Sequence, residues 1–165
     1  MRPSPRERVP ERRVGRSVMQ TDRDDGGVVV CTESALCTDV KANGHALVAD
    51  EPPALGGTDA GPTPYDYLLT ALGSCTAITV RMYADRKGWP LESVTVRVEH
   101  GRIHAEDCGE CETESGRIDH IGLELELEGP LEAGQRERLR EIADKCPVKR
   151  TLGSEVLVET RAATK

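Results

Sequence analysis

Two cysteines, Cys75 and Cys146, stand in sequence settings that could support thiol chemistry. Cys146 directly precedes Pro147, so it can occupy the N-cap of the short turn that follows, where unpaired backbone N–H groups favour a thiolate. Lys149 and Arg150 add positive charge just beyond it. Cys75 has small and aliphatic neighbours in sequence, so a thiolate there needs a partner that the fold must bring. Plain packing in the core is the alternative for both cysteines.

A third group of candidate residues lies in the stretch HGRIHAEDCGEC, which contains His100, His104, Cys108 and Cys111. Four nitrogen and sulfur ligands within so short a stretch could close a tetrahedral zinc site. The two cysteines also form a CxxC pair, which could work by thiol–disulfide exchange. A polar loop with two exposed thiols is the remaining interpretation. The sequence leaves these three open.

The element that must position Cys75 is a long helix over residues 63–87. Thr63 and Asp66 have the spacing of a capping box, and Gly88 supplies a residue that tolerates the left-handed conformation at the other end. Nearly every residue from 67 to 84 is apolar or small, which predicts a helix buried on all sides. Its polar interruptions exclude a membrane span, so we expect no membrane partner.

The remaining pattern predicts an α+β fold. Alternating apolar residues and turn signals predict strands over residues 28–33, 35–41, 45–50, 92–100, 118–128 and 155–161, and a second, amphipathic helix over 131–145. Asn43-Gly44 predicts a tight hairpin between the second and third strands. Cys31 and Cys37 lie on the first two strands in this interpretation and are most simply core-facing.

Composition sets the class of protein. The 165 residues form one domain over 28–165, preceded by a tail over 1–27 that lacks apolar periodicity and is expected to be disordered. A net charge of −7 argues against a nucleic-acid partner. The sequence before the six cysteines does not have the pattern of a signal peptide. We therefore expect a cytoplasmic protein whose thiols are normally reduced.

The chain resembles the OsmC/Ohr family of thiol-dependent hydroperoxide-reducing proteins in two stretches, GPTPYDYLLTALGSCTAITVRMYADRKGWPLESV and ADKCPVKRTL. Within that family it is most similar to a branch with GG-x-D-x-GP and HA-x-DC-x-x-CE motifs. The resemblance implies an OsmC-like fold, in which antiparallel sheets wrap around a long central helix in an intertwined homodimer. It also implies that Cys75 attacks a hydroperoxide or related electrophile, that Cys146 resolves the product as a disulfide, and that an external dithiol restores the pair.

The peroxidase members of that family activate their cysteine with an arginine and a glutamate. Those positions fall here near Leu55 and on Tyr65. We therefore expect Arg150, with Lys149 beside it, to supply the positive charge and Tyr65 to stand where the family has its carboxylate. Asp66 is one residue late for that role and is expected to cap the helix.

Enzymatic turnover is left open by this departure. The alternatives are a non-enzymatic metal- or ligand-binding dimer that uses the loop from His100 to Cys111, and a redox sensor that oxidises slowly. Apart from zinc at that loop, the resemblance implies no cofactor.

Overall fold

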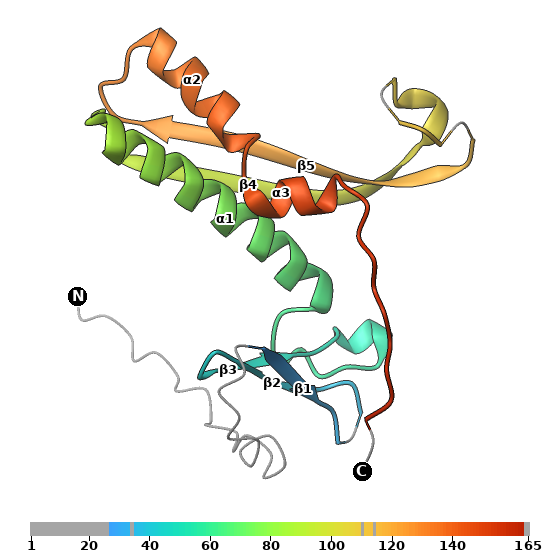
Figure 1. Cartoon of the computed structure of the whole chain (residues 1–165). Coiled ribbons are helices and arrows are strands. Elements are labelled where there is room, and N and C mark those ends of the chain that lie inside the picture. The colour runs from blue at the N-terminus through green and yellow to red at the C-terminus, as the bar shows by residue number, and fades with distance from the viewer. Residues whose placement is uncertain (1–26, 34, 110, 114, 164–165) are drawn as a thin grey trace, which may run out of the picture. The chain divides into compact units, whose positions relative to one another are not determined.

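The structure is a computed structural model that describes residues 27–33, 35–109, 111–113 and 115–163 (Figure 1). Those residues fall into two compact units, one that ends at Asp66 and one that begins at Tyr67. All but the last residue of the tail predicted over residues 1–27 lies outside the described residues. Within the described part of the chain, no helix is long and apolar enough to cross a membrane.

The first unit contains a three-stranded antiparallel sheet in the order β1 (Val28–Cys31), β2 (Thr38–Ala42) and β3 (His45–Ala49). The predicted hairpin joins β2 to β3: Asn43 and Gly44 have φ angles of 46° and 83°. Two consecutive left-handed residues are what a type I′ turn requires. Cys31 ends β1, whereas Cys37 comes just before β2 rather than on it, and both thiols are half-buried.

A buried carboxylate, Asp50, organises the loop after β3. Only 1% of its surface is exposed. Its two oxygens accept hydrogen bonds from the backbone N–H groups of Glu51, Thr58 and Ala60 and from the Thr58 hydroxyl. These bonds fold the loop, including the short helix η2 (Pro53–Leu55), around one charge. The hydroxyl of Thr58 contributes most to lowering the pKa of Asp50 to about 2, while burial opposes the shift.

The long predicted helix is α1 (Pro64–Lys87). Its capping box is present, because the Asp66 carboxylate accepts hydrogen bonds from the N–H and hydroxyl of Thr63 at 2.9 and 2.8 Å. At its other end Gly88 has a φ of 65°. There Gly88 donates to Asp85 and Trp89 to Ala84, which is the Schellman arrangement.

Within a single chain α1 is buried on one side only, so its expected burial on all sides stays a prediction for the dimer. One stripe of the helix is buried, at the spacing of one turn: Leu72, Thr76, Val80 and Ala84. On other faces Ile78 is 58% exposed and Met82 is 66% exposed. The elements of one chain cover one side of this helix, because a two-stranded sheet and two short helices present too little apolar surface to enclose it.

The second unit places α1 against a long two-stranded antiparallel sheet, β4 (Ser93–His104) and β5 (Arg117–Glu128). The pairing runs from Ser93 opposite Glu128 to His104 opposite Arg117. We predicted that β4 would end at His100, where the alternation of valines stops. The strand continues because the backbone ladder with β5 continues, with Ile103 facing Ile118.

Two helices complete this unit: α2 (Ala133–Ala143) and α3 (Pro147–Leu152). Gln135 caps α2, since its side chain accepts a hydrogen bond from the Glu132 N–H at 3.0 Å. A buried cluster joins α1 to α2 and to the two loops at the Ser93–Glu128 end of the sheet, and consists of Val80, Ala84, Leu91, Leu131 and Leu139. Figure 1 shows α1 and α2 near one end of the β4–β5 ribbon and the loop between the two strands at the other.

The strand predicted over residues 155–161 is wrong. Residues 154–163 form neither helix nor strand, and Leu157 and Val158 are 84% and 83% exposed. The apolar run has strand propensity, but a strand needs a neighbour for its backbone hydrogen bonds. No described strand of this chain pairs with it.

Candidate functional site

The second unit brings Cys75 and Cys146 together. Cys146 is the N-cap of α3, with Pro147 at the first helical position, as its sequence setting predicts. Its carbonyl accepts a hydrogen bond from the Arg150 N–H at 3.0 Å, and its side chain is completely buried. Cys75 lies in the middle of α1 with a half-buried side chain. Its thiol lies near Cys146, because it is one of the groups that lower the pKa of the Cys146 thiol.

The surroundings of Cys146 favour its thiolate. Burial alone would raise the pKa of this thiol. Hydrogen bonds to its sulfur outweigh that effect, and they come from the backbone N–H of Lys149, the Thr76 hydroxyl, the Cys75 thiol and the backbone N–H of Val148. The pKa of Cys146 is therefore lowered. The groups named here stabilise the negative charge of the thiolate through their dipoles.

Thr76 is the residue of this site that sequence reasoning missed. It is 1% exposed, and its hydroxyl has no hydrogen bond of regular geometry to another group in the described part of the chain. What it can act on is the Cys146 sulfur, whose pKa it helps to lower. The available signal was a polar residue directly after the cysteine of a helix that was predicted to be buried.

A cavity of about 470 Å³ is lined by Thr76, which follows Cys75 in α1, but by neither cysteine. Its apolar wall comes from the sheet, with Val96, Leu123 and Leu125. Its polar rim carries one group from the sheet, His120, and three from α2 and α3 and the turn between them: Arg140, Asp144 and Lys149. The arrangement can hold a small organic molecule that has one polar end.

Two cationic side chains, those of Lys149 and Arg150, follow Cys146 closely in sequence. The Lys149 ammonium group pairs with the Asp144 carboxylate. Arg150 is exposed on α3, and among the described residues its guanidinium forms no ion pair or hydrogen bond. The backbone N–H of Lys149, not its side chain, is what lowers the pKa of Cys146. The supporting roles that we expected for Arg150 and Lys149 stay predictions.

Tyr65 and Asp66 lie at the beginning of α1, in the first unit. Asp66 is occupied as the helix cap, and the Thr63 hydroxyl is the main cause that lowers the pKa of its carboxyl. The Tyr65 side chain is 55% exposed. The capping role that we expected for Asp66 is confirmed, and a catalytic role for Tyr65 stays a prediction.

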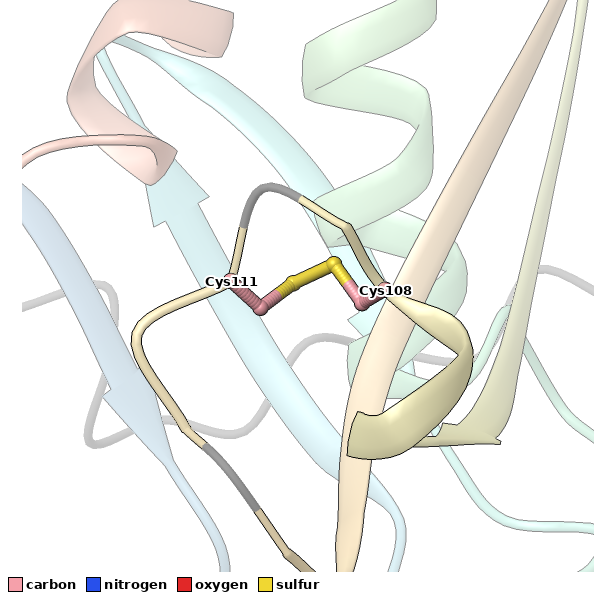
Figure 2. Close-up of a disulfide and its surroundings, with 2 residues drawn as sticks. All are labelled: Cys108 and Cys111. Atoms are coloured by element: carbon pink, nitrogen blue, oxygen red, sulfur yellow. A yellow bond between two sulfur atoms is a disulfide. The ribbon is translucent and has the colours of Figure 1, made fainter.

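In the CxxC loop, Cys108 and Cys111 form a disulfide with their Cα atoms 5.5 Å apart (Figure 2). His100 is separate from them, since its Nε2 lies 3.0 Å from Asp119 Oδ1. Over the described ranges, no group of three or more His, Cys, Asp or Glu side chains is arranged to hold a metal ion. A disulfide offers no thiolate ligands, so zinc could bind at His100, His104, Cys108 and Cys111 only when the two cysteines are reduced. That zinc site stays a prediction.

Comparisons with known proteins agree on one family. The family model of OsmC-like proteins matches residues 57–161. Among solved structures, an organic hydroperoxide resistance protein from Legionella pneumophila is 18% identical and has a TM-score of 0.55, with 76% of this chain and 86% of that chain covered. An OsmC-like protein from Mycoplasma pneumoniae is 20% identical with a TM-score of 0.57, covering 81% and 89% of the two chains.

A third structure is an organic hydroperoxide resistance protein from Elizabethkingia anophelis with thiocyanate bound, at 18% identity and a TM-score of 0.56, covering 75% of this chain and 84% of that one. No curated protein matches the chain. The structural neighbours share the α+β fold described above, and the family model spans both Cys75 and Cys146. The chain therefore belongs to the OsmC-like protein family.

Proposed function

We propose that this protein reduces organic hydroperoxides or related electrophiles with Cys75 and Cys146 as its redox pair. The observation that carries the proposal is that the fold brings Cys75, in the middle of α1, beside Cys146, the buried N-cap of α3. The lowered pKa of the Cys146 thiol supports its role as the resolving thiolate. Two relatives described as organic hydroperoxide resistance proteins support this class of substrate.

The reaction follows from the two positions. The Cys75 thiolate attacks the outer oxygen of the hydroperoxide, an S–O bond forms, the O–O bond breaks, and the alkoxide leaves with a proton as the alcohol. The resulting sulfenic acid at Cys75 is attacked by the Cys146 thiolate, which forms the disulfide and releases water. An external dithiol then reduces the disulfide and is itself oxidised. The cavity lined by Thr76 and Leu125 offers room for the organic part of the substrate.

Peroxide consumption tests this proposal. We expect the full chain to consume cumene hydroperoxide with dithiothreitol as reductant, and Cys75→Ser to abolish turnover. Cys146→Ser should leave a single oxidation that a sulfenic-acid reagent traps at Cys75. Cys37→Ser is the matched control, because Cys37 is also a half-buried free thiol but lies in the other unit. Unchanged consumption by Cys75→Ser would refute the mechanism, and one oxidation without turnover in the wild type would identify a redox sensor instead.

The proposed function includes a homodimer. Ile78 and Met82 are large apolar residues exposed on α1, and Leu157 and Val158 are exposed in the C-terminal segment. A second copy of the chain could cover these surfaces, which lack a partner in one chain. Light scattering should give twice the chain mass, and Ile78→Lys with Met82→Lys should give the single mass. Glu137→Lys, on the exposed side of α2, is the control that should leave the dimer intact.

A further inference from the structure

The Cys108–Cys111 disulfide is a second pair of cysteines outside the site described above. It lies in the loop after η3 (Ala105–Asp107), at the end of the β4–β5 hairpin that is remote from α2 (Figures 1 and 2). Cys108 is half-buried and Cys111 is exposed. An external thiol can therefore reach at least one of the two sulfur atoms.

This disulfide does little to hold the fold together. It spans three positions of the chain, and a bridge across so short a loop restricts the unfolded chain least. The β4–β5 pairing is already complete up to His104 and Arg117. Beyond that pair, the N–H of Ala105 donates to the Gly116 carbonyl at 2.8 Å, which closes the base of the loop without the sulfur atoms. A purely structural role leaves the bridge with nothing to stabilise.

Negative charge surrounds the pair. Asp107 directly precedes Cys108, Glu112 directly follows Cys111, and both carboxylates are exposed, as is Glu106. Such a cluster repels an anionic thiol that approaches the disulfide and favours a neutral or cationic one. The loop therefore has both an accessible disulfide and a basis for selecting its reaction partner.

We propose that Cys108 and Cys111 form a reversible redox pair that accepts electrons from external dithiols that carry no negative charge at the reacting end. The pair works separately from Cys75 and Cys146, and the proposal does not depend on peroxide reduction. It assigns to this loop a thiol–disulfide exchange site whose substrates are dithiols in one direction and disulfides in the other.

In the proposed exchange, an external dithiol reduces the Cys108–Cys111 disulfide in two steps. A thiolate of the external dithiol attacks the exposed sulfur of Cys111, the S–S bond breaks, and the electron pair leaves on Cys108, which takes a proton from water. The second thiol of the donor then attacks the mixed disulfide and releases Cys111 as a thiol. The donor departs as a disulfide after transferring two electrons and two protons. In the reverse direction, the reduced pair reduces an external disulfide.

The redox state of this pair can be read independently of the other four cysteines. Cleavage after Arg102 and Arg117 yields a peptide of residues 103–117 in which Cys108 and Cys111 are the only cysteines. The folded full chain is equilibrated in dithiothreitol buffers of graded poise, alkylated with one reagent, reduced under denaturing conditions and alkylated with a second. We expect the peptide to pass from fully oxidised to fully reduced in one two-electron step. A peptide that stays oxidised in excess dithiothreitol, or reduced in the most oxidising buffer, would overturn the proposal.

Two comparisons test the direction and the charge preference. Cys108→Ser should form a mixed disulfide at Cys111 with a chromogenic aromatic disulfide about tenfold faster than Cys111→Ser does at Cys108, because access controls such rates. The wild type at low salt should be reduced about tenfold faster by cysteamine than by 3-mercaptopropionate, corrected for the reactivity of each thiol. The variant Asp107→Asn with Glu112→Gln should lose that preference. An equal preference in both proteins would overturn the assigned class of partner.

Discussion

The hydroxyl of Thr76 should determine how much thiolate the Cys75–Cys146 pair holds at neutral pH. Thr76→Val replaces the hydroxyl with a methyl group of nearly the same shape, so the packing of α1 is preserved. The change removes one of the donors that lower the pKa of Cys146 and leaves the backbone N–H groups of Lys149 and Val148 in place. The pKa of Cys146 should therefore rise in the variant.

The size of the effect follows from the kind of bond that is lost. A full hydrogen bond to a charged acceptor contributes about 1.5 kcal/mol net, so the irregular contact of Thr76 can change the thiolate population by at most about tenfold. Stability should respond differently. Because the Thr76 hydroxyl is buried without a regular partner, its removal also relieves a desolvation cost. The variant should unfold at the same temperature as the wild type or a higher one.

The pKa of Cys146 is measured by following the ultraviolet absorbance of thiolate as a function of pH. The curve of Cys146→Ser is subtracted so that only the titration of Cys146 remains. Thr79→Val is the matched control, because it makes the same chemical change one turn along α1, where the hydroxyl donates to the Cys75 carbonyl at 2.7 Å and not to a sulfur. The reasoning would be refuted by an unchanged titration midpoint in Thr76→Val, or by an equal shift in Thr79→Val.

Two further predictions concern stability. Asp50 has a folded pKa of about 2 against an ordinary value of 3.8, so its contribution is present above pH 4 and is lost as the pH falls toward 2; thermal melts followed by circular dichroism should show that loss in the wild type and a smaller one in Asp50→Asn. Gly129 has a φ of 124°, and an added Cβ would lie 2.2 Å from the Pro90 carbonyl oxygen. Gly129→Ala should thus lower the free energy of unfolding by about 2 kcal/mol or more in a urea titration, whereas Gly134→Ala, where a Cβ meets nothing, should not.

Much of the fold could be predicted because its signals are local. Asn43-Gly44 allows little besides a tight hairpin, and Thr63, Asp66 and Gly88 mark both ends of α1 within a few residues of each other in sequence. The position of Cys146 at the N-cap of α3 could also be predicted, because a residue directly before a proline that begins a helix has few other roles. In each case the residues that decide the structure are neighbours in the chain.

What could not be predicted depends on contacts between distant segments. The C-terminal run with Leu157 has strand propensity, yet nothing in sequence states whether a partner strand exists. Thr76 acquires its role only because α3 brings Cys146 against it. The burial of Asp50 depends on several hydrogen-bond donors of the following loop meeting one carboxylate. The glycine-rich composition of that loop did not predict this arrangement. The role of Arg150 stays a prediction for the same reason: charge near a cysteine in sequence does not establish charge near its sulfur.

The two-stranded β4–β5 ribbon has a consequence for handling the protein. Within the described residues each strand pairs only with the other, so neither outer edge has a partner strand, although the Leu127 carbonyl accepts a hydrogen bond from the Arg136 side chain. Such edges invite intermolecular strand addition and aggregation. The exposed side chains of Arg97, Glu99, Glu124 and Glu126 act as gatekeepers, since a strand docking there must bring its own charges against them. Surface-entropy variants made to promote crystallisation should leave these four residues unchanged.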